Sequence, residues 1–202
     1  MCSSDLSQES IGILRRSDRP EALVFAFDSL MVNAYFLGRI TEEREAMNEM
    51  IEIATQLDDQ WLLAFALFGA GMVAVIDGEY AEATRIADWS LKLYHDVGDP
   101  SGSTTPLIVL GHVALARGEY EAAKEHYLRC LEISAEVGFH YSTQTASKYL
   151  AKVALSIGAT TEAEKYLRQS LWITNEIGFV RDIINLLYEF ARVRVAQNLP
   201  EQ

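Results

Sequence analysis

The residues best suited to chemistry are four histidines and two cysteines: His95, His112, His126, His140, Cys2 and Cys130. The histidines lack His-Glu-x-x-His spacing and match no group of cysteines or carboxylates, as a zinc site would require. The cysteines fit neither a disulfide framework nor a zinc pattern. We therefore expect no metal, no cofactor and no catalytic residue, and we predict that the protein is not an enzyme.

The net charge and its distribution along the chain indicate which class of partner the protein could bind. The 202 residues carry a formal net charge of −12, which argues against nucleic-acid binding because phosphate neutralisation needs clustered Lys and Arg. Residues 1–60 hold 12 acids and 5 bases and residues 61–140 hold 11 and 5, whereas residues 141–202 hold 6 and 7. The last third, with Lys148, Lys152 and Arg192, is therefore the part best suited to an acidic partner.

No targeting or membrane segment is expected. The chain contains no run of about 20 apolar residues, and its first twenty residues lack the basic start and apolar centre of a signal peptide. We predict a cytoplasmic protein without membrane contact.

Glycine recurs every forty residues, and this period organises the chain. One series is Gly38, Gly78, Gly118 and Gly158, and a second is Gly98, Gly138 and Gly178. Apolar residues between the glycines recur at steps of three and four, which predicts amphipathic helices, two to a unit. A fixed period of this length is typical of arrays in which each unit packs on its neighbours.

One unit carries a recognisable motif: Leu110, Gly111, Ala114, Gly118, Glu119, Tyr120, Ala123, Tyr127 and Leu131. This pattern resembles the tetratricopeptide repeat (TPR) family, and its forty-residue period resembles the long-helix variety found in bacterial signalling proteins. Those proteins include the sensor arms of STAND-type ATPases and related transcription activators. The resemblance implies an all-α, right-handed superhelical solenoid of antiparallel helix pairs.

The repeat frame predicts one array over residues 1–202 with about ten helices. Its parts are an orphan second helix (1–18), four repeats (19–58, 59–98, 99–138 and 139–178) and a terminal half-repeat (179–202). Because the array begins and ends in mid-unit, we expect either a piece of a longer protein or a small protein whose end helices are caps. The Pro-containing segment 98–106 interrupts the repeat frame. We expect it to be a hinge, a ligand-facing loop or a plain connection. Thr105 is the expected N-cap of the helix that follows it.

In the family that the chain resembles, first helices line a concave groove that binds peptides. The positions that would face it supply our candidate groove residues: Phe25, Tyr35, Phe65, Phe68, Met72, Ile108, His112, Lys148, Lys152, Tyr188 and Arg192. Their character changes from apolar to basic along the chain, which suits a protein or peptide that is both acidic and apolar. The alternative is that the apolar members pack internally and the lysines are solvated.

The family's clamp for chaperone tails is not expected here. It needs an asparagine six residues before the turn glycine, where this chain has Met72, His112 and Lys152.

Two tryptophans stand in columns that are otherwise polar. Trp89 aligns with Glu49, Arg129 and Gln169, and Trp172 with Glu52, Lys92 and Glu132. Exposed tryptophans anchor partners, so Trp89 and Trp172 are candidates for an outer-face interface or a homodimer, unless each ring lies flat on a neighbour. The chain is thus interpreted as the interaction arm of a bacterial signalling or regulatory protein, with a receptor domain for a small ligand or signalling peptide and a dimerisation module as alternatives.

Overall fold

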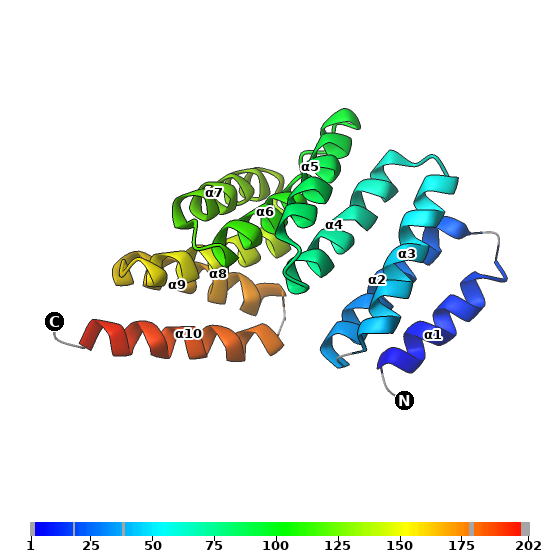
Figure 1. Ribbon diagram of the computed structural model, residues 1–202. Helices are drawn as coiled ribbons and strands as arrows, with labels where there is room; N and C mark the ends of the chain where they lie inside the picture. Colours follow the sequence, from blue (N-terminus) through cyan, green and yellow to red (C-terminus); the bar gives the residue numbers. More distant parts are fainter. Residues whose placement is uncertain (1–2, 18, 38, 178–179, 199–202) are drawn as a thin grey trace. The chain divides into compact units, whose positions relative to one another are not determined.

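The computed structural model describes residues 3–17, 19–37, 39–177 and 180–198, and these residues form ten α-helices without a strand (Figure 1). The helices are α1 (Ser3–Leu14), α2 (Pro20–Leu37), α3 (Ile40–Gln56), α4 (Gln60–Ile76), α5 (Tyr80–Asp96), α6 (Thr104–Ala116), α7 (Tyr120–Val137), α8 (His140–Ser156), α9 (Thr160–Ile177) and α10 (Val180–Asn198). The prediction of an all-α chain of about ten helices is confirmed.

Glycines with positive φ end helices where the forty-residue period places them. Gly78 has a φ of +79° and follows α4, and the N–H of Glu79 donates to the carbonyl of Ala74 at 2.8 Å. This arrangement satisfies a carbonyl that the helix leaves without a partner and turns the chain back into α5. Asp58 is the exception, since it adopts a φ of +52° where later units have Gly98 and Gly138.

The chain divides into two compact units. The N-terminal unit is Met1–Gly102, with α1 to α5, and the C-terminal unit is Ser103–Gln202, with α6 to α10. The division falls inside the segment 98–106 that interrupts the repeat frame. Helix α6 begins at Thr104 with Ser103 as its N-cap residue, so the prediction of Thr105 as the N-cap is wrong.

Within each unit the helices pack as pairs. In the N-terminal unit α2 packs on α3 and α4 on α5, and in the C-terminal unit α6 packs on α7 and α8 on α9. Val24, Phe27 and Met50 are among the buried core residues of the first unit. Ala163 and Leu167 of α9 share a buried cluster in the second with Leu186 of α10. The first helices α2, α4, α6 and α8 therefore each pack on the second helix that follows them.

None of the helices in the described part of the chain is long and apolar enough to cross a membrane.

Candidate functional site

Two lysines flank a tyrosine on α8 in the C-terminal unit. The ammonium nitrogen of Lys148 lies 5.2 Å from the centre of the Tyr149 ring, and that of Lys152 lies 5.0 Å from it. Both distances are within the range of cation–π attraction. Lys148 and Lys152 share a helix face because they are four residues apart, so α8 presents two positive charges around one aromatic ring.

His112 of α6 and Tyr127 of α7 complete this arrangement, which we call the lysine cluster: His112, Tyr127, Lys148, Tyr149 and Lys152. The His112 and Tyr149 rings are 4.1 Å apart, and Tyr127 stacks on Tyr149 at 5.5 Å. His112 Nδ1 and Tyr127 Oη form a hydrogen bond of 2.6 Å. The sequence prediction thus named three of the five members, and the structure brings them together.

Protonation in the lysine cluster follows from burial and charge. Burial, followed by the charges of Lys148 and Lys152, lowers the pKa of His112 to about 3, so the imidazole is neutral at physiological pH. Burial also raises the pKa of the Tyr127 hydroxyl far above its ordinary value. The positive charge therefore resides on the two lysines, beside neutral aromatic and hydrogen-bonding groups. Such a group can bind a carboxylate together with an adjoining apolar side chain.

The close approach of Tyr127 explains a glycine of the repeat motif. A Cβ atom at Gly111 of α6 would collide with the Tyr127 ring. Only glycine at this position lets α7 bring that ring beneath His112.

The basic residue predicted on α10 is already paired. Arg192 Nη1 lies 2.8 Å from Glu189 Oε2, and Glu189 is 8% exposed. Tyr188, on the same helix, is 66% exposed. Arg192 is thus partly neutralised within α10.

The N-terminal unit contains an aromatic cluster of Phe25, Trp61, Phe65 and Tyr94. Trp61 and Phe65 stack at 5.9 Å with an angle of 7° between their planes, and Phe25 lies 5.5 Å from Phe65. Trp61 also meets Tyr94 edge-on at 6.2 Å. Phe25 is 47% exposed, so the cluster reaches the surface and offers an apolar contact.

Trp61 also holds the segment that follows α5. Its Nε1–H donates to Asp99 Oδ2 at 2.7 Å, and the backbone N–H of Ser101 donates to Asp99 Oδ1 at 2.9 Å. Burial raises the pKa of the Asp99 carboxyl, but hydrogen bonds from Ser101, Trp61 and the Gly102 backbone outweigh it and lower that pKa overall. Asp99 therefore remains ionised and keeps the segment against the aromatic cluster.

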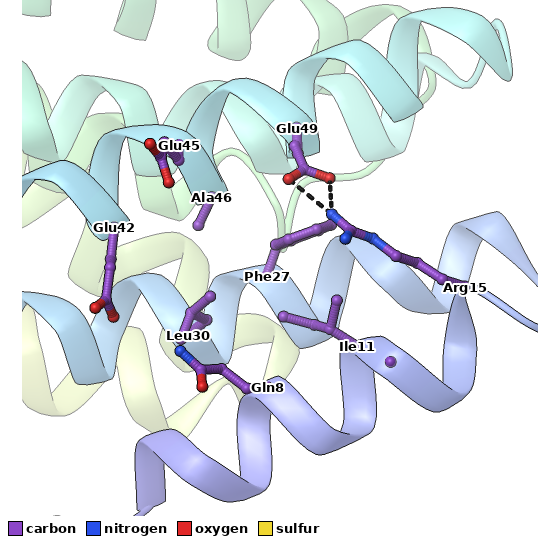
Figure 2. A pocket seen from close by; sticks show the side chains of 10 residues that line it. Gln8, Ile11, Arg15, Phe27, Leu30, Glu42, Glu45, Ala46 and Glu49 are labelled. Atoms are coloured by element: carbon purple, nitrogen blue, oxygen red, sulfur yellow. Dashed lines mark hydrogen bonds and ion pairs between the residues drawn. The ribbon is translucent and has the colours of Figure 1, made fainter.

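A separate hollow of about 280 Å³ lies among α1, α2 and α3. Figure 2 shows Arg15, in the turn directly after α1, reaching Glu49 on α3, where Arg15 Nη2 lies 2.8 Å and 2.5 Å from the two carboxylate oxygens. Glu42 and Glu45 lie on the same helix. Its charged lining residues are three glutamates against the single Arg15, so the hollow has a net negative charge. The two units thus present hollows and clusters of opposite charge.

Other predicted residues have varied surroundings. Phe68 and Met72 are half-buried, whereas Ile108 is 2% exposed and cannot meet a ligand in this conformation. The side chain of Tyr35 lies outside the described residues. Trp89 is 40% exposed and Trp172 is 64% exposed, so both are accessible, and their role as an interface stays a prediction.

Sequence reasoning missed Trp61 and Tyr149. Tyr149 stands in a column with Ser29, Gly69, Val109 and Glu189, where no residue type recurs. The available signal was local: an aromatic residue directly beside one lysine and three residues before another.

Two further observations concern metal ligands and the buried cysteine. Among the described residues no group of three or more His, Cys, Asp or Glu side chains could hold a metal ion. Cys130 is fully buried, and burial raises the pKa of its thiol to about 12, which disfavours the nucleophilic thiolate.

Comparison with known proteins identifies the family of this chain. A family model described as the MalT-like TPR region matches residues 3–200. The chain belongs to this family. The TPR interpretation of the forty-residue period is therefore confirmed. A search of curated proteins finds no match.

Solved structures share the fold of this MalT-like TPR region at low sequence identity. BtubC (BKLC) from P. vanneervenii is 16% identical with a TM-score of 0.67, and the match covers 99% of this chain and 91% of BtubC. A STAND protein with a tetratricopeptide repeat sensor from Pyrococcus horikoshii is 18% identical with a TM-score of 0.62, covering 91% of this chain and 29% of that protein. The apo form of RapI is 14% identical with a TM-score of 0.61, covering 96% and 76%.

Proposed function

We propose that this MalT-like TPR region is a non-enzymatic interaction module that binds an acidic and apolar protein segment, as the sensor or scaffold arm of a signalling or regulatory protein. The lysine cluster carries the proposal. Lys148 and Lys152 supply two positive charges at one ring, and neutral His112 adds no competing charge at physiological pH.

Different residues of the lysine cluster would contact different parts of the bound segment. The lysines would attract and orient a carboxylate, and the faces of Tyr149 and His112 would contact an apolar side chain next to it. The structural likeness to a STAND protein with a TPR sensor supports the sensor role at the level of the fold.

The test is a binding measurement with a defined probe. A fluorescein-labelled peptide that alternates Leu and Phe with Asp and Glu would be titrated into the protein and followed by fluorescence anisotropy. The double variant Lys148→Glu, Lys152→Glu should bind it at least about tenfold more weakly, because the attraction becomes repulsion.

A matched control separates the cluster from net charge. Lys92→Glu with Lys165→Glu makes the same change in charge at exposed lysines on α5 and α9, and it should leave affinity within about twofold. Equal losses in the two double variants, or equal binding of a peptide with Lys and Arg in place of Asp and Glu, would contradict the proposal.

A further inference from the structure

Asp28 on α2 is a carboxylate without a partner in the part of the chain that the structure describes. It is half-buried, and neither a hydrogen bond nor an ion pair from a described residue reaches it. Burial raises the pKa of its carboxyl to about 6, so the group is mostly ionised at physiological pH. A charge withdrawn from water costs free energy unless an opposite charge or a hydrogen-bond donor meets it. Asp28 therefore lacks the group that would stabilise its charged form.

The position of Asp28 on α2 directs its side chain toward α4. Phe25 lies 5.5 Å from Phe65 of α4. Farther along α2, the end of the Met31 side chain lies 3.0 Å from where a Cβ of Gly69 would stand. Phe25, Asp28 and Met31 are spaced three residues apart, so each is turned about 60° from the one before it around the helix. Asp28 thus lies midway between two residues that both contact α4.

The part of α4 that faces Asp28 is aromatic. Phe65 and Phe68 are half-buried, and Trp61 stacks on Phe65 at 5.9 Å. The planes of Phe25 and Phe65 are tilted by 44°, so the two rings present differently directed faces next to the carboxylate. The face of an aromatic ring attracts a cation within about 6 Å of its centre. Carboxylate and rings therefore favour the same kind of ligand, a positive charge carried on an apolar stem.

The neighbouring helices supply no positive charge to this carboxylate. Helices α1, α3 and α4 pack on α2, and α1, α2 and α4 contain no Lys, Arg or His. Arg44, the basic residue of α3, lies 2.6 Å from Asp77. Arg15, directly after α1, lies 2.8 Å from Glu49. The positive charge that would stabilise Asp28 therefore has to come from a bound partner.

We propose that Asp28 and the rings of Phe25 and Phe65 bind a lysine side chain of a protein segment, with its ammonium group on the carboxylate and its methylene groups on the rings. A lysine suits the site because its flexible four-carbon stem is apolar and ends in a compact charge. The site is open at Phe25, which is 47% exposed, so the lysine can remain part of a larger molecule.

The charge of the surrounding sequence favours the same partner. Residues 1–60 contain 12 acids and 5 bases, which attract a basic segment. This site lies in the N-terminal unit, and the inference does not depend on peptide binding at the lysine cluster of the C-terminal unit.

The test compares two short peptides, acetyl-Leu-Lys-Phe-amide and its analogue with norleucine in place of lysine, which keeps an apolar stem without the ammonium group. Isothermal titration calorimetry at pH 7.5 should show that the wild type binds the lysine peptide at least about tenfold more tightly. Asp28→Asn should bind both peptides equally. This variant should fold, since it removes an unpaired charge, and far-UV circular dichroism checks that it does.

The preference for lysine should also depend on pH. Protonation of Asp28 removes its charge, so affinity for the lysine peptide should fall by up to about tenfold from pH 7.5 to pH 5, with no such fall in Asp28→Asn. That comparison separates Asp28 from the other charged side chains described on the packed helices. These are Glu9 of α1, Glu21 of α2, and Glu42, Arg44, Glu45, Glu49 and Glu52 of α3, and α4 contains none.

Glu21→Gln is the matched control, because it removes one exposed carboxylate from the same helix. It should bind the lysine peptide within about twofold of the wild type. Equal binding of the two peptides to the wild type overturns the proposal, as does a preference for lysine that survives in Asp28→Asn. An equal loss in Glu21→Gln would attribute the preference to net charge. If n-pentylamine binds as tightly as the lysine peptide, the site takes a free amine and the proposed protein segment is wrong.

Discussion

The two units of this chain follow the same forty-residue repeat but carry different side chains on their helices. The N-terminal unit places an aromatic cluster around Trp61 and an acidic hollow beside Arg15. The C-terminal unit places two lysines and a neutral histidine around Tyr149. The repeat determines which positions of a helix meet a neighbour, and the residue at each position determines whether the result is apolar, acidic or basic. Units that share a backbone pattern therefore differ in the chemistry that their surfaces offer.

Gly69 and Gly111 give the sharpest contrast between the units. A Cβ at Gly111 meets the rigid Tyr127 ring, whereas a Cβ at Gly69 lies 3.0 Å from the flexible end of Met31. We expect Gly111→Ala to lower the free energy of unfolding by about 2 kcal/mol through overpacking. Gly69→Ala should be neutral or stabilising by up to about 1 kcal/mol, since alanine favours helix.

Urea unfolding can assign these effects to a unit. Fluorescence of Trp61 and Trp89 reports on the N-terminal unit, and that of Trp172 on the C-terminal unit, in variants that retain only the relevant tryptophans. Stabilisation by Gly111→Ala would show that Tyr127 moves freely and would remove the contrast.

The units should also respond to pH in opposite directions. The pKa of His112 is lowered to about 3 by burial and then by Lys148 and Lys152, so the unfolded chain takes up a proton below about 6.5 and the folded chain does not. Its contribution to stability is present above that pH and is lost as pH falls. Burial raises the pKa of Asp28 to about 6, so the N-terminal unit loses stability as pH rises from about 4 through 6.

Between pH 4 and pH 8 each of these effects is on the order of 3 kcal/mol. Urea unfolding from pH 4 to 8 measures them, and Asp28→Asn should flatten the slope of the N-terminal unit without changing that of the C-terminal unit. NMR titration should find His112 neutral at pH 5. A His112 that titrates near 6.5 would contradict the buried, lysine-flanked environment.

The smallest effect concerns a turn that breaks the glycine pattern. Asp58 adopts a φ of +52° where the units that follow have glycine. Asp58→Gly removes backbone strain from the folded state, but glycine also raises the entropy of the unfolded chain. The net effect should be to stabilise the N-terminal unit by roughly 0.5 kcal/mol. Gly98→Asp is the reciprocal change at an equivalent turn and should destabilise. Thermal unfolding of both variants measures the difference, and equal signs would exclude a strain effect.

Much of the fold could be predicted from the sequence because helices and turns depend on residues close together in the chain. The turn at Gly78 and the helix before it follow from positive φ and from apolar spacing, and both lie where the period predicts. The start of α6 was misplaced because Ser103 and Thr105 are equally suited to cap a helix and no local feature separates them. The candidate site was only partly predictable: His112, Lys148 and Lys152 were named from groove positions, and Tyr149 between them was not.

The amino-acid sequence by itself determined the ten helices, the turns between them and the columns that repeat every forty residues, because helix period and glycine conformation act within a few residues of chain. Only the tertiary structure decided that Trp61 reaches Asp99, that Ile108 is buried and that Ile184 is exposed. These outcomes depend on which helix covers a given face. That covering element lies tens of residues away in sequence, and a column cannot specify it.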